Sequence, residues 1–147
     1  MALLSTALGE AFERLSRFDQ AHLLAVRQVL CSASPVSLDL QHAALLHDIA
    51  KAGTIHQPGR VRLPHRVGAV VLRRYWPSGL ERLARLPAPR WRAGFALAVH
   101  HPALGAKMAA DLGCSARTCW LIHHHHDMPP PDDPELLLLI AADRDGA

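Results

Sequence analysis

The 147-residue sequence predicts an all-α protein. Apolar residues recur at helical spacing in several segments, and residues that begin or end helices stand between those segments. The clearest case runs from Leu38 to Gly53, where good helix formers precede a glycine stop. We therefore expect a helical bundle. We interpret residues 1–147 as a single domain, because a chain of this length can bury one core.

The composition favours a globular protein and is compatible with a small anionic substrate. Half of the residues are hydrophobic, and the net charge is +3 with a pI near 9.1. No block of Lys and Arg resembles a nucleic-acid-binding arm, so the sequence carries no strong nucleic-acid signal. The mild positive charge suits a small anionic substrate. The sequence indicates no oligomeric state.

The sequence also favours a cytoplasmic location. No apolar run is long enough to span a bilayer, and the N-terminus lacks the pattern of a signal peptide. The three cysteines, Cys31, Cys114 and Cys119, are odd in number and lack zinc-ribbon spacing. We interpret them as reduced core thiols and expect no contact with membranes.

The most informative stretch is Gln41–Lys51, in which His47 and Asp48 end an apolar run. A helix this apolar is expected to be buried, and burying an imidazole and a carboxylate without partners is costly. Imidazole nitrogen and carboxylate oxygen are ligands of divalent metal ions. The alternative is a helix end with two polar residues in water. However, Ala-Leu-Leu-His-Asp-Ile-x-Lys resembles the doublet motif of the HD superfamily of metal-dependent phosphohydrolases, although Ala50 stands where many members have glycine.

That resemblance implies a compact helical bundle of about six to eight helices around a metal site. The resemblance also makes His22 a candidate metal ligand. His22 lies 25 residues before His47, on a helix that is expected to begin near Phe18. His22 shares an expected apolar face with Phe18, Ala25, Val26 and Val29. By itself this pattern suits a core histidine bonded to a carbonyl. HD domains, however, place their first histidine on the helix before the doublet.

A second histidine site is expected at His101. Pro102 is suited to the first turn of a helix, so we place His101 at or just before the N-cap. Leu104, Met108 and Leu112 would then form a core face before Gly113 ends the helix. His-Pro-x-x-Gly-Ala resembles the third histidine site of many HD domains.

The gap from Asp48 to His101 is longer than in compact HD domains. His65, only 17 residues after the doublet, is therefore a rival third ligand. We expect a helix from His65 to Trp76, with Val67, Val70, Val71 and Tyr75 on its inner side. Arg66, in this arginine-rich middle section, is a candidate for binding substrate phosphate.

The last two candidate sites lie near the C-terminus. We expect Ser115 to cap a helix that leads into His125 and His126, with His125 on the buried side. The segment resembles Leu-Ile-x-x-His-His-Glu of HD domains, which favours His125 and leaves His126 as a second ligand from the same turn. A final helix from Glu135 to Ala147 would place Asp143 on an apolar face, where a carboxylate needs a cation.

Taken together, the resemblance implies a site for one or two divalent metal ions, such as Mn, Fe, Co or Ni, with Mg a further option. The implied ligands are His22, His47, Asp48, His101, His125, His126 and Asp143. The implied reaction is hydrolysis of a small phosphorylated substrate, such as a nucleotide, by a metal-bound hydroxide. Asp48 would bridge the ions of a two-metal site or orient the reacting groups, and Lys51 would hold the substrate phosphate.

Two other classes stay open: a degenerate HD domain that serves as a binding or signalling module, and a di-iron oxygenase built from the same ligands. No Gly-Tyr-Pro follows the histidine run, where Met128-Pro129-Pro130-Pro131 stands instead. This departure argues against hydrolysis of cyclic dinucleotides of the HD-GYP type.

Overall fold

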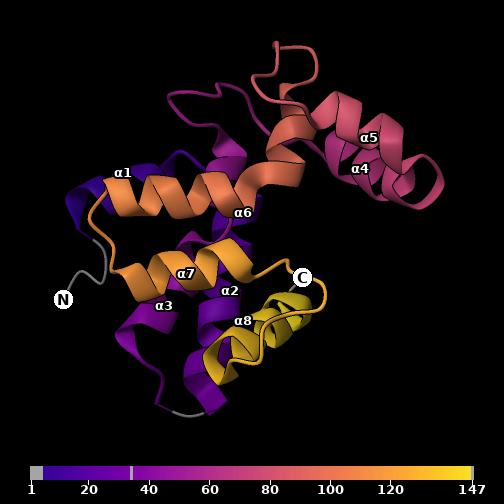
Figure 1. Cartoon of the computed structure of the whole chain (residues 1–147). Coiled ribbons are helices and arrows are strands. Elements are labelled where there is room, and N and C mark those ends of the chain that lie inside the picture. The colour runs from indigo at the N-terminus through magenta and orange to yellow at the C-terminus, as the bar shows by residue number, and fades with distance from the viewer. Residues whose placement is uncertain (1–4, 34, 147) are drawn as a thin grey trace.

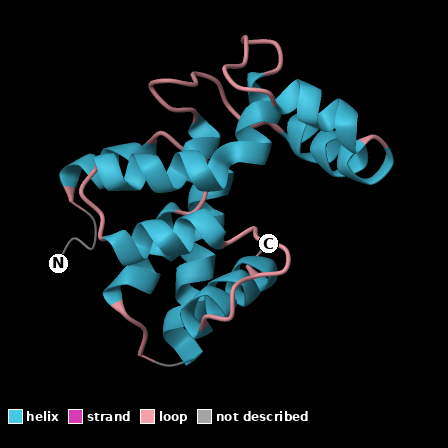
Figure 2. Ribbon diagram, in the orientation of Figure 1, coloured by secondary structure: helices cyan, strands magenta, loops and turns pink. Residues whose placement is uncertain are grey.

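The computed structural model describes residues 5–33 and 35–146, and within them it confirms the all-α prediction (Figures 1 and 2). The helices in this part of the chain are α1 (Thr6–Glu13), α2 (Arg17–Ala33), α3 (Leu38–Leu46), the 3-10 helix η1 (Ile49–Ala52), α4 (Leu63–Tyr75), α5 (Pro77–Ala84), α6 (Ala93–Asp111), α7 (Ala116–His124) and α8 (Pro134–Asp145). None of these helices is both long and apolar enough to cross a lipid bilayer.

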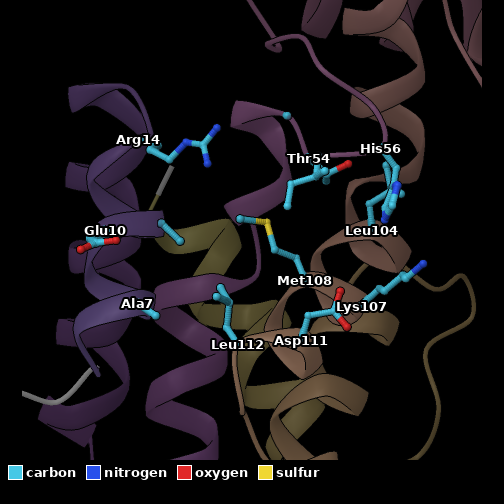
Figure 3. Close-up of a pocket in the computed structure, with 13 residues that line it drawn as sticks. Ala7, Glu10, Arg14, Thr54, His56, Leu104, Lys107, Met108, Asp111 and Leu112 are labelled. Carbon is cyan, nitrogen blue, oxygen red and sulfur yellow. The ribbon is translucent and has the colours of Figure 1, made fainter.

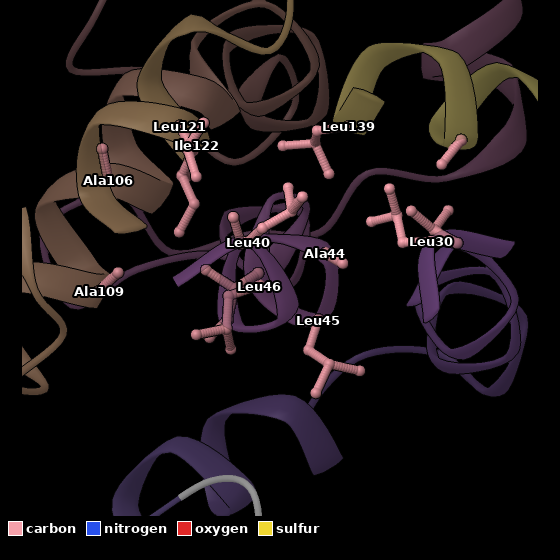
Figure 4. Close-up of a cluster of buried hydrophobic side chains, with 14 of the residues drawn as sticks. Leu30, Leu40, Ala44, Leu45, Leu46, Ala106, Ala109, Leu121, Ile122 and Leu139 are labelled. Carbon is pink, nitrogen blue, oxygen red and sulfur yellow. The ribbon is translucent and has the colours of Figure 1, made fainter. Parts of the chain in front are cut away.

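Helix α3 lies at the centre of the core (Figure 4). It packs against α2, α7 and α8, and every residue from Ala43 to Ala50 is buried. Leu40 and Leu46 are fully inaccessible, and Leu121, Ile122 and Leu139 from the neighbouring helices surround them. The second half of α3, Ala43–Leu46, is apolar on all sides, and such a segment is stable only when it is enclosed in this way. The doublet at the end of α3 is therefore carried to the middle of the molecule.

Helices α4 and α5 form a pair that projects from the rest of the bundle, beside the first half of α6 (Figure 1). The prediction of which residues of α4 face the core is wrong. Val67, Val70, Val71 and Tyr75 are all exposed, and only Ala69 is buried. Small residues permit the closest approach of two helices, and α4 packs on α6 through them.

The predicted apolar face of α2 is also partly wrong. Phe18 and Val29 are exposed, by 70% and 40% respectively, and the buried residues are Leu23, Val26 and Leu30. The buried face is thus rotated about the helix axis relative to the predicted apolar face. His22 lies at its edge and is half-buried. That position leaves its ring accessible to groups on other helices.

Several predicted helix ends are confirmed. The Ser115 side chain accepts a hydrogen bond from the Thr118 backbone N–H at 3.0 Å, as an N-cap does. Gly113 follows the end of α6 with a φ of 87°, which only glycine adopts readily. The helix predicted from Leu38 to Gly53 is divided in two, because α3 ends at Leu46 and Gly53 ends η1 instead. Gly53 has a φ of 88°, and a side chain there would collide with the Gly59 backbone.

The interpretation of all three cysteines as core thiols is wrong for one of them. Cys31 is exposed, whereas Cys114 and Cys119 are half-buried and pack against the core; all three are free. Burial raises the pKa of the Cys114 thiol to about 11 and also raises the pKa of Cys119.

Alkylation should therefore distinguish these thiols. At pH 8, a group with a pKa of about 11 is a thiolate in roughly one molecule in a thousand, and only the thiolate reacts. We expect iodoacetamide to modify Cys31 first, and the rate at Cys114 to rise as the pH is raised towards 11. Peptide mass spectrometry over time would measure both. Earlier modification of Cys114 than of Cys31 at pH 8 would contradict the burial described here.

Candidate metal centre

The seven predicted metal ligands come together from five helices and the α3–η1 junction. Two groups have candidate ligand atoms within 4.8 Å of one another: His22, His47 and Asp48 in the first, and His101, His125 and His126 in the second. The groups touch, because the ring centroids of His47 and His125 are 4.9 Å apart. Residues up to 121 positions apart thus share one location.

Asp143 from α8 joins the first group. Its Oδ1 lies 2.8 Å from Nε2 of His22 and 3.2 Å from Nε2 of His47. Leu136 and Leu139 on the same helix are fully buried, so the predicted face of α8 is confirmed. The carboxylate is positioned by the packing of its own helix.

Asp48 lies between the two groups. Its Oδ1 is 3.3 Å from Nε2 of His101, and its Oδ2 is 3.9 Å from Nε2 of His47. Each carboxylate oxygen thus faces a different group of histidines. Oδ2 also accepts from the Lys51 ammonium at 2.5 Å. Asp48 therefore has one oxygen on the side of each histidine group and an ammonium beside it.

In four of the histidines, Nδ1 is held by a backbone carbonyl. The acceptors are Ala44 for His47 at 3.1 Å, Ala98 for His101 at 3.0 Å, Ile122 for His125 at 2.6 Å and Gly146 for His22 at 3.0 Å. A carbonyl can only accept, so Nδ1 carries the proton in every case. When such a ring is neutral, Nε2 presents its lone pair to the centre, which is the state a metal ligand requires.

Helix ends supply three of these carbonyls. Ala44 and Ile122 lie in the last turns of α3 and α7, and Gly146 follows α8. The final carbonyls of a helix lack backbone donors within the helix. The local fold therefore provides the acceptor that orients each ring, and the ring satisfies a carbonyl that would otherwise lack a partner.

The fourth carbonyl lies inside α6, at a position where one backbone hydrogen bond of the helix is missing. His101 was predicted at an N-cap, and this prediction is wrong: α6 begins at Ala93 and contains Pro102 in its interior. Proline has no N–H to donate to the carbonyl four residues earlier, which belongs to Ala98. The His101 ring donates to that carbonyl instead. Pro102 thus has a local role in orienting its neighbour, which sequence reasoning missed.

Burial sets the charge of the second group of histidines. It lowers the pKa of His101 to about 3, and it also lowers the pKa values of His125 and His126. Burial opposes ionisation of Asp48 as well, but the neighbouring His47 and the Lys51 ammonium outweigh it and hold the pKa of Asp48 well below its usual range. The second group therefore presents neutral imidazoles near an ionised carboxylate.

In the first group, the pKa of one histidine is shifted in the opposite direction. The hydrogen bond with Asp143 raises the pKa of His22, although burial opposes this. For Asp143, burial opposes ionisation, but the hydrogen bonds with His22 and His47 hold its pKa well below the usual range. His22 and Asp143 thus form an ion pair at the accessible edge of the cluster.

The donor set fits a divalent cation. His101 and His125 each have a buried Nε2 atom without a hydrogen-bond partner among the described residues. Leaving a buried polar atom unpaired costs about 1–3 kcal/mol. In neutral His101, the Nε2 lone pair also faces an oxygen of Asp48, so two acceptors oppose each other. A cation between them would turn this repulsion into coordination, and nitrogen and carboxylate oxygen are suitable ligands for it.

An open cavity of about 410 Å³ adjoins the cluster. His126, which is exposed, lines it together with Arg73, His123, Pro102 and Met128. His47, Asp48, His101 and His125 are buried, whereas His126 opens to this cavity, so this side offers an approach for a small molecule. Sequence reasoning placed Arg73 in a solvated arginine-rich face and did not single it out, because nothing in the sequence brings α4 beside the histidine run.

Two other candidates lie outside the cluster. His65 accepts a hydrogen bond from the Arg62 backbone N–H at 3.0 Å and packs against Phe95, so it is not brought near the doublet. Arg66 forms an ion pair with the buried Asp19 carboxylate. That contact ties α4 to α2 and gives no support to a role in substrate binding.

A separate cavity lies between α1, the loop after η1 and α6 (Figure 3). Its volume is about 340 Å³, and Leu104, Met108 and Leu112 line one wall. These three residues were predicted to form a core face, but they are only half-buried. None of the cluster histidines or aspartates lines this cavity, so we do not assign it to the candidate metal centre.

A family comparison agrees with the geometry. The family model described as HD domain matches residues 19–147, which is nearly the whole chain. No curated protein and no solved structure matches the chain. The chain therefore belongs to the HD domain family, whose members bind divalent metal ions and are typically metal-dependent hydrolases.

Proposed function

We propose that this HD-domain protein hydrolyses a nucleotide or another small phosphate ester with one or two divalent metal ions. The proposed ligands are His22, His47, Asp48, His101, His125, His126 and Asp143. The observation that supports this most is the set of four Nδ1–H groups fixed by carbonyls, because three of these rings have Nε2 beside a carboxylate oxygen and the fourth, His125, has a buried Nε2 without a partner among the described residues. When bound, the metal would supply Lewis-acid chemistry, lowering the pKa of a water molecule and neutralising phosphoryl charge.

The protein's own residues would orient the reactants. The two oxygens of Asp48 face the two groups of histidines, so this carboxylate is suited to fix their spacing and to accept a hydrogen bond from the attacking water. The Lys51 ammonium, now paired with Asp48, is close enough to the cluster to contact a substrate phosphate. The 410 Å³ cavity beside His126 would hold the rest of the substrate, with Arg73 adding positive charge.

Elemental analysis combined with a phosphatase screen tests this proposal. We expect the purified protein to contain one or two equivalents of a transition metal such as Mn, Fe, Co or Ni, and to release phosphate from at least one nucleotide. Oxygen uptake by an iron-loaded protein that releases no phosphate would instead favour an oxygenase. Absence of stoichiometric metal would favour a binding module.

His101 and His65 provide a matched pair of variants. His101→Ala should lower metal content or hydrolysis by about tenfold or more, because it removes an oriented Nε2 ligand. His65→Ala should leave metal content near that of the unmodified protein, since its ring lies beside Phe95. Mass spectrometry of the bound metal would measure both. The reverse result would move the third ligand to α4.

A further inference from the structure

Arginine is distributed unevenly along this chain. Residues 60–92 contain nine of the sixteen Lys and Arg residues, and their only acidic residue is Glu81. The rest of the chain contains seven basic and twelve acidic residues. The positive charge of the protein is therefore concentrated on α4, α5 and the loops that flank them, away from most of the candidate ligands.

Some of these arginines are structural. Arg92 donates to the carbonyls of Leu83, Arg85 and Pro87, and Arg66 pairs with Asp19. These contacts use the guanidinium groups to hold the protruding helices in place. These contacts give a structural role to two of the nine arginines, and they do not involve the guanidinium groups of the other seven.

Three of the remaining arginines line one cavity of about 630 Å³. Arg60, Arg62 and Arg90 surround it together with His65, and no acidic residue lines it. Within residues 5–33 and 35–146, none of these three guanidinium groups has a carboxylate within ion-pair distance. Arg60 instead donates to the Arg14 carbonyl at 3.2 Å. Three arginines thus border one space, and none of them is paired with a carboxylate in the described part of the chain.

The walls of this cavity are fixed in place. The Val61 backbone N–H, between two of the arginines, donates to the Lys51 carbonyl at 2.9 Å. Gly59 approaches so closely that a side chain there would meet Ala93, and a side chain at Gly94 would collide with His65. The two glycines allow loop, α4 and α6 to meet. The backbone that carries the arginines is thus held in place, so less entropy is lost in ordering it when a ligand binds.

We propose that this cavity binds a small polyphosphate anion, either inorganic or attached to a nucleoside. Several negative charges are needed to balance three guanidinium groups, and arginine binds phosphate oxygens through paired hydrogen bonds. The volume lies within the range of small-molecule sites. The first residues of α6, Ala93 and Gly94, also line it, so the positive end of that helix adds to the arginines that carry the inference.

This site is separate from the candidate metal centre. None of the proposed metal ligands lines the cavity. Gly94 and His101 are seven residues apart on α6, or roughly 10 Å along the helix axis. Leu97, which is fully buried, lies between them on the helix. Polyphosphate binding here can therefore be tested independently of hydrolysis.

The test is isothermal titration of the full chain, with its metal, by sodium tripolyphosphate at constant ionic strength. The double variant Arg62→Gln/Arg90→Gln should bind at least about tenfold more weakly than the unmodified protein. The charge-matched control Arg74→Gln/Arg82→Gln, which lies outside the cavity, should change the affinity less than about twofold. Lys51→Ala, at the candidate metal centre, is expected to lose any phosphate binding that depends on Lys51, but it should keep the binding component that Arg62→Gln/Arg90→Gln removes. A nucleoside triphosphate in a parallel titration shows whether the nucleoside adds affinity.

Three results would overturn the proposal. Unchanged binding by the cavity variant would exclude these arginines, and loss of that same binding component in Lys51→Ala would place the anion at the metal centre. Equal weakening in both arginine pairs, with a single-stranded oligonucleotide binding more tightly than tripolyphosphate, would indicate a diffuse basic face. Metal content, measured in every sample, separates these results from a failure of the proposed hydrolase.

Discussion

Asp48→Asn is expected to lose bound metal and hydrolysis together. The substitution preserves the shape of the side chain but removes the charge that faces both groups of histidines. We expect metal content to fall to about a tenth or less, and phosphate release to fall by about a thousandfold. Metal analysis and a phosphate-release assay on the same preparation would measure both quantities.

The asparagine variant is preferable to alanine because Lys51 is paired with this carboxylate. Both variants break the ion pair, but the amide oxygen of asparagine can still accept a hydrogen bond from the Lys51 ammonium, whereas Asp48→Ala would leave this ammonium without that partner in a mostly buried position, where breaking a pair costs about 3–5 kcal/mol. Loss of metal would then be difficult to separate from unfolding. Asp111→Asn, on the exposed end of α6, is the control and should retain metal and activity. Normal metal content in Asp48→Asn would remove this residue from the proposed site.

The sequence was sufficient to predict the residues that the fold brings together. His47 and Asp48 follow the uninterrupted apolar run Ala43–Leu46, which the core encloses, so both residues are buried with it. Asp143 lies on the same face as Leu136 and Leu139, and its burial follows from theirs. In each case, helical periodicity places a polar side chain toward the core, and the HD motif then relates one helix to another.

The position of His101 within its helix could not be predicted by the same reasoning. A proline usually indicates the first turn of a helix, because its missing N–H is harmless there. Inside α6 the same proline leaves the Ala98 carbonyl without its backbone donor, and the His101 ring replaces that donor. The compensation depends on a side-chain contact that local propensity does not contain. The start of α6, eight residues before the histidine, was missed for this reason.

The orientation of α4 was beyond prediction for a different reason. Periodicity shows that Val67, Val70 and Val71 share a side of the helix, but it does not show that this side faces the protein. The contact with α6 is made where Gly68 and Ala69 allow close approach, and Phe95 lies directly against Gly68. As a result, the cavities beside Arg73 and beside Arg62 were not predicted.

Asp143→Asn should abolish most of the stabilisation that metal gives to the fold. Asp143 connects α8 to His22 on α2 and to His47 after α3, and Gly146 accepts from the His22 ring. A metal bound at this junction would hold the C-terminal helix to the centre of the molecule. At a hundredfold excess over Kd, a ligand stabilises the native state by about 2.7 kcal/mol. For a chain of this size, that corresponds to a rise in Tm of about 5–10 °C.

The informative quantity is the difference in Tm with and without metal. Asp143→Asn also removes an ion pair with His22, so its Tm without metal should change as well. The metal-dependent rise should nevertheless fall to about a quarter or less of its usual size, because one carboxylate ligand is missing. Asp145→Asn, an exposed residue two positions along α8, should keep the full rise. Calorimetry of both variants, with metal and after chelation, would measure these shifts, and equal rises would show that Asp143 is no ligand.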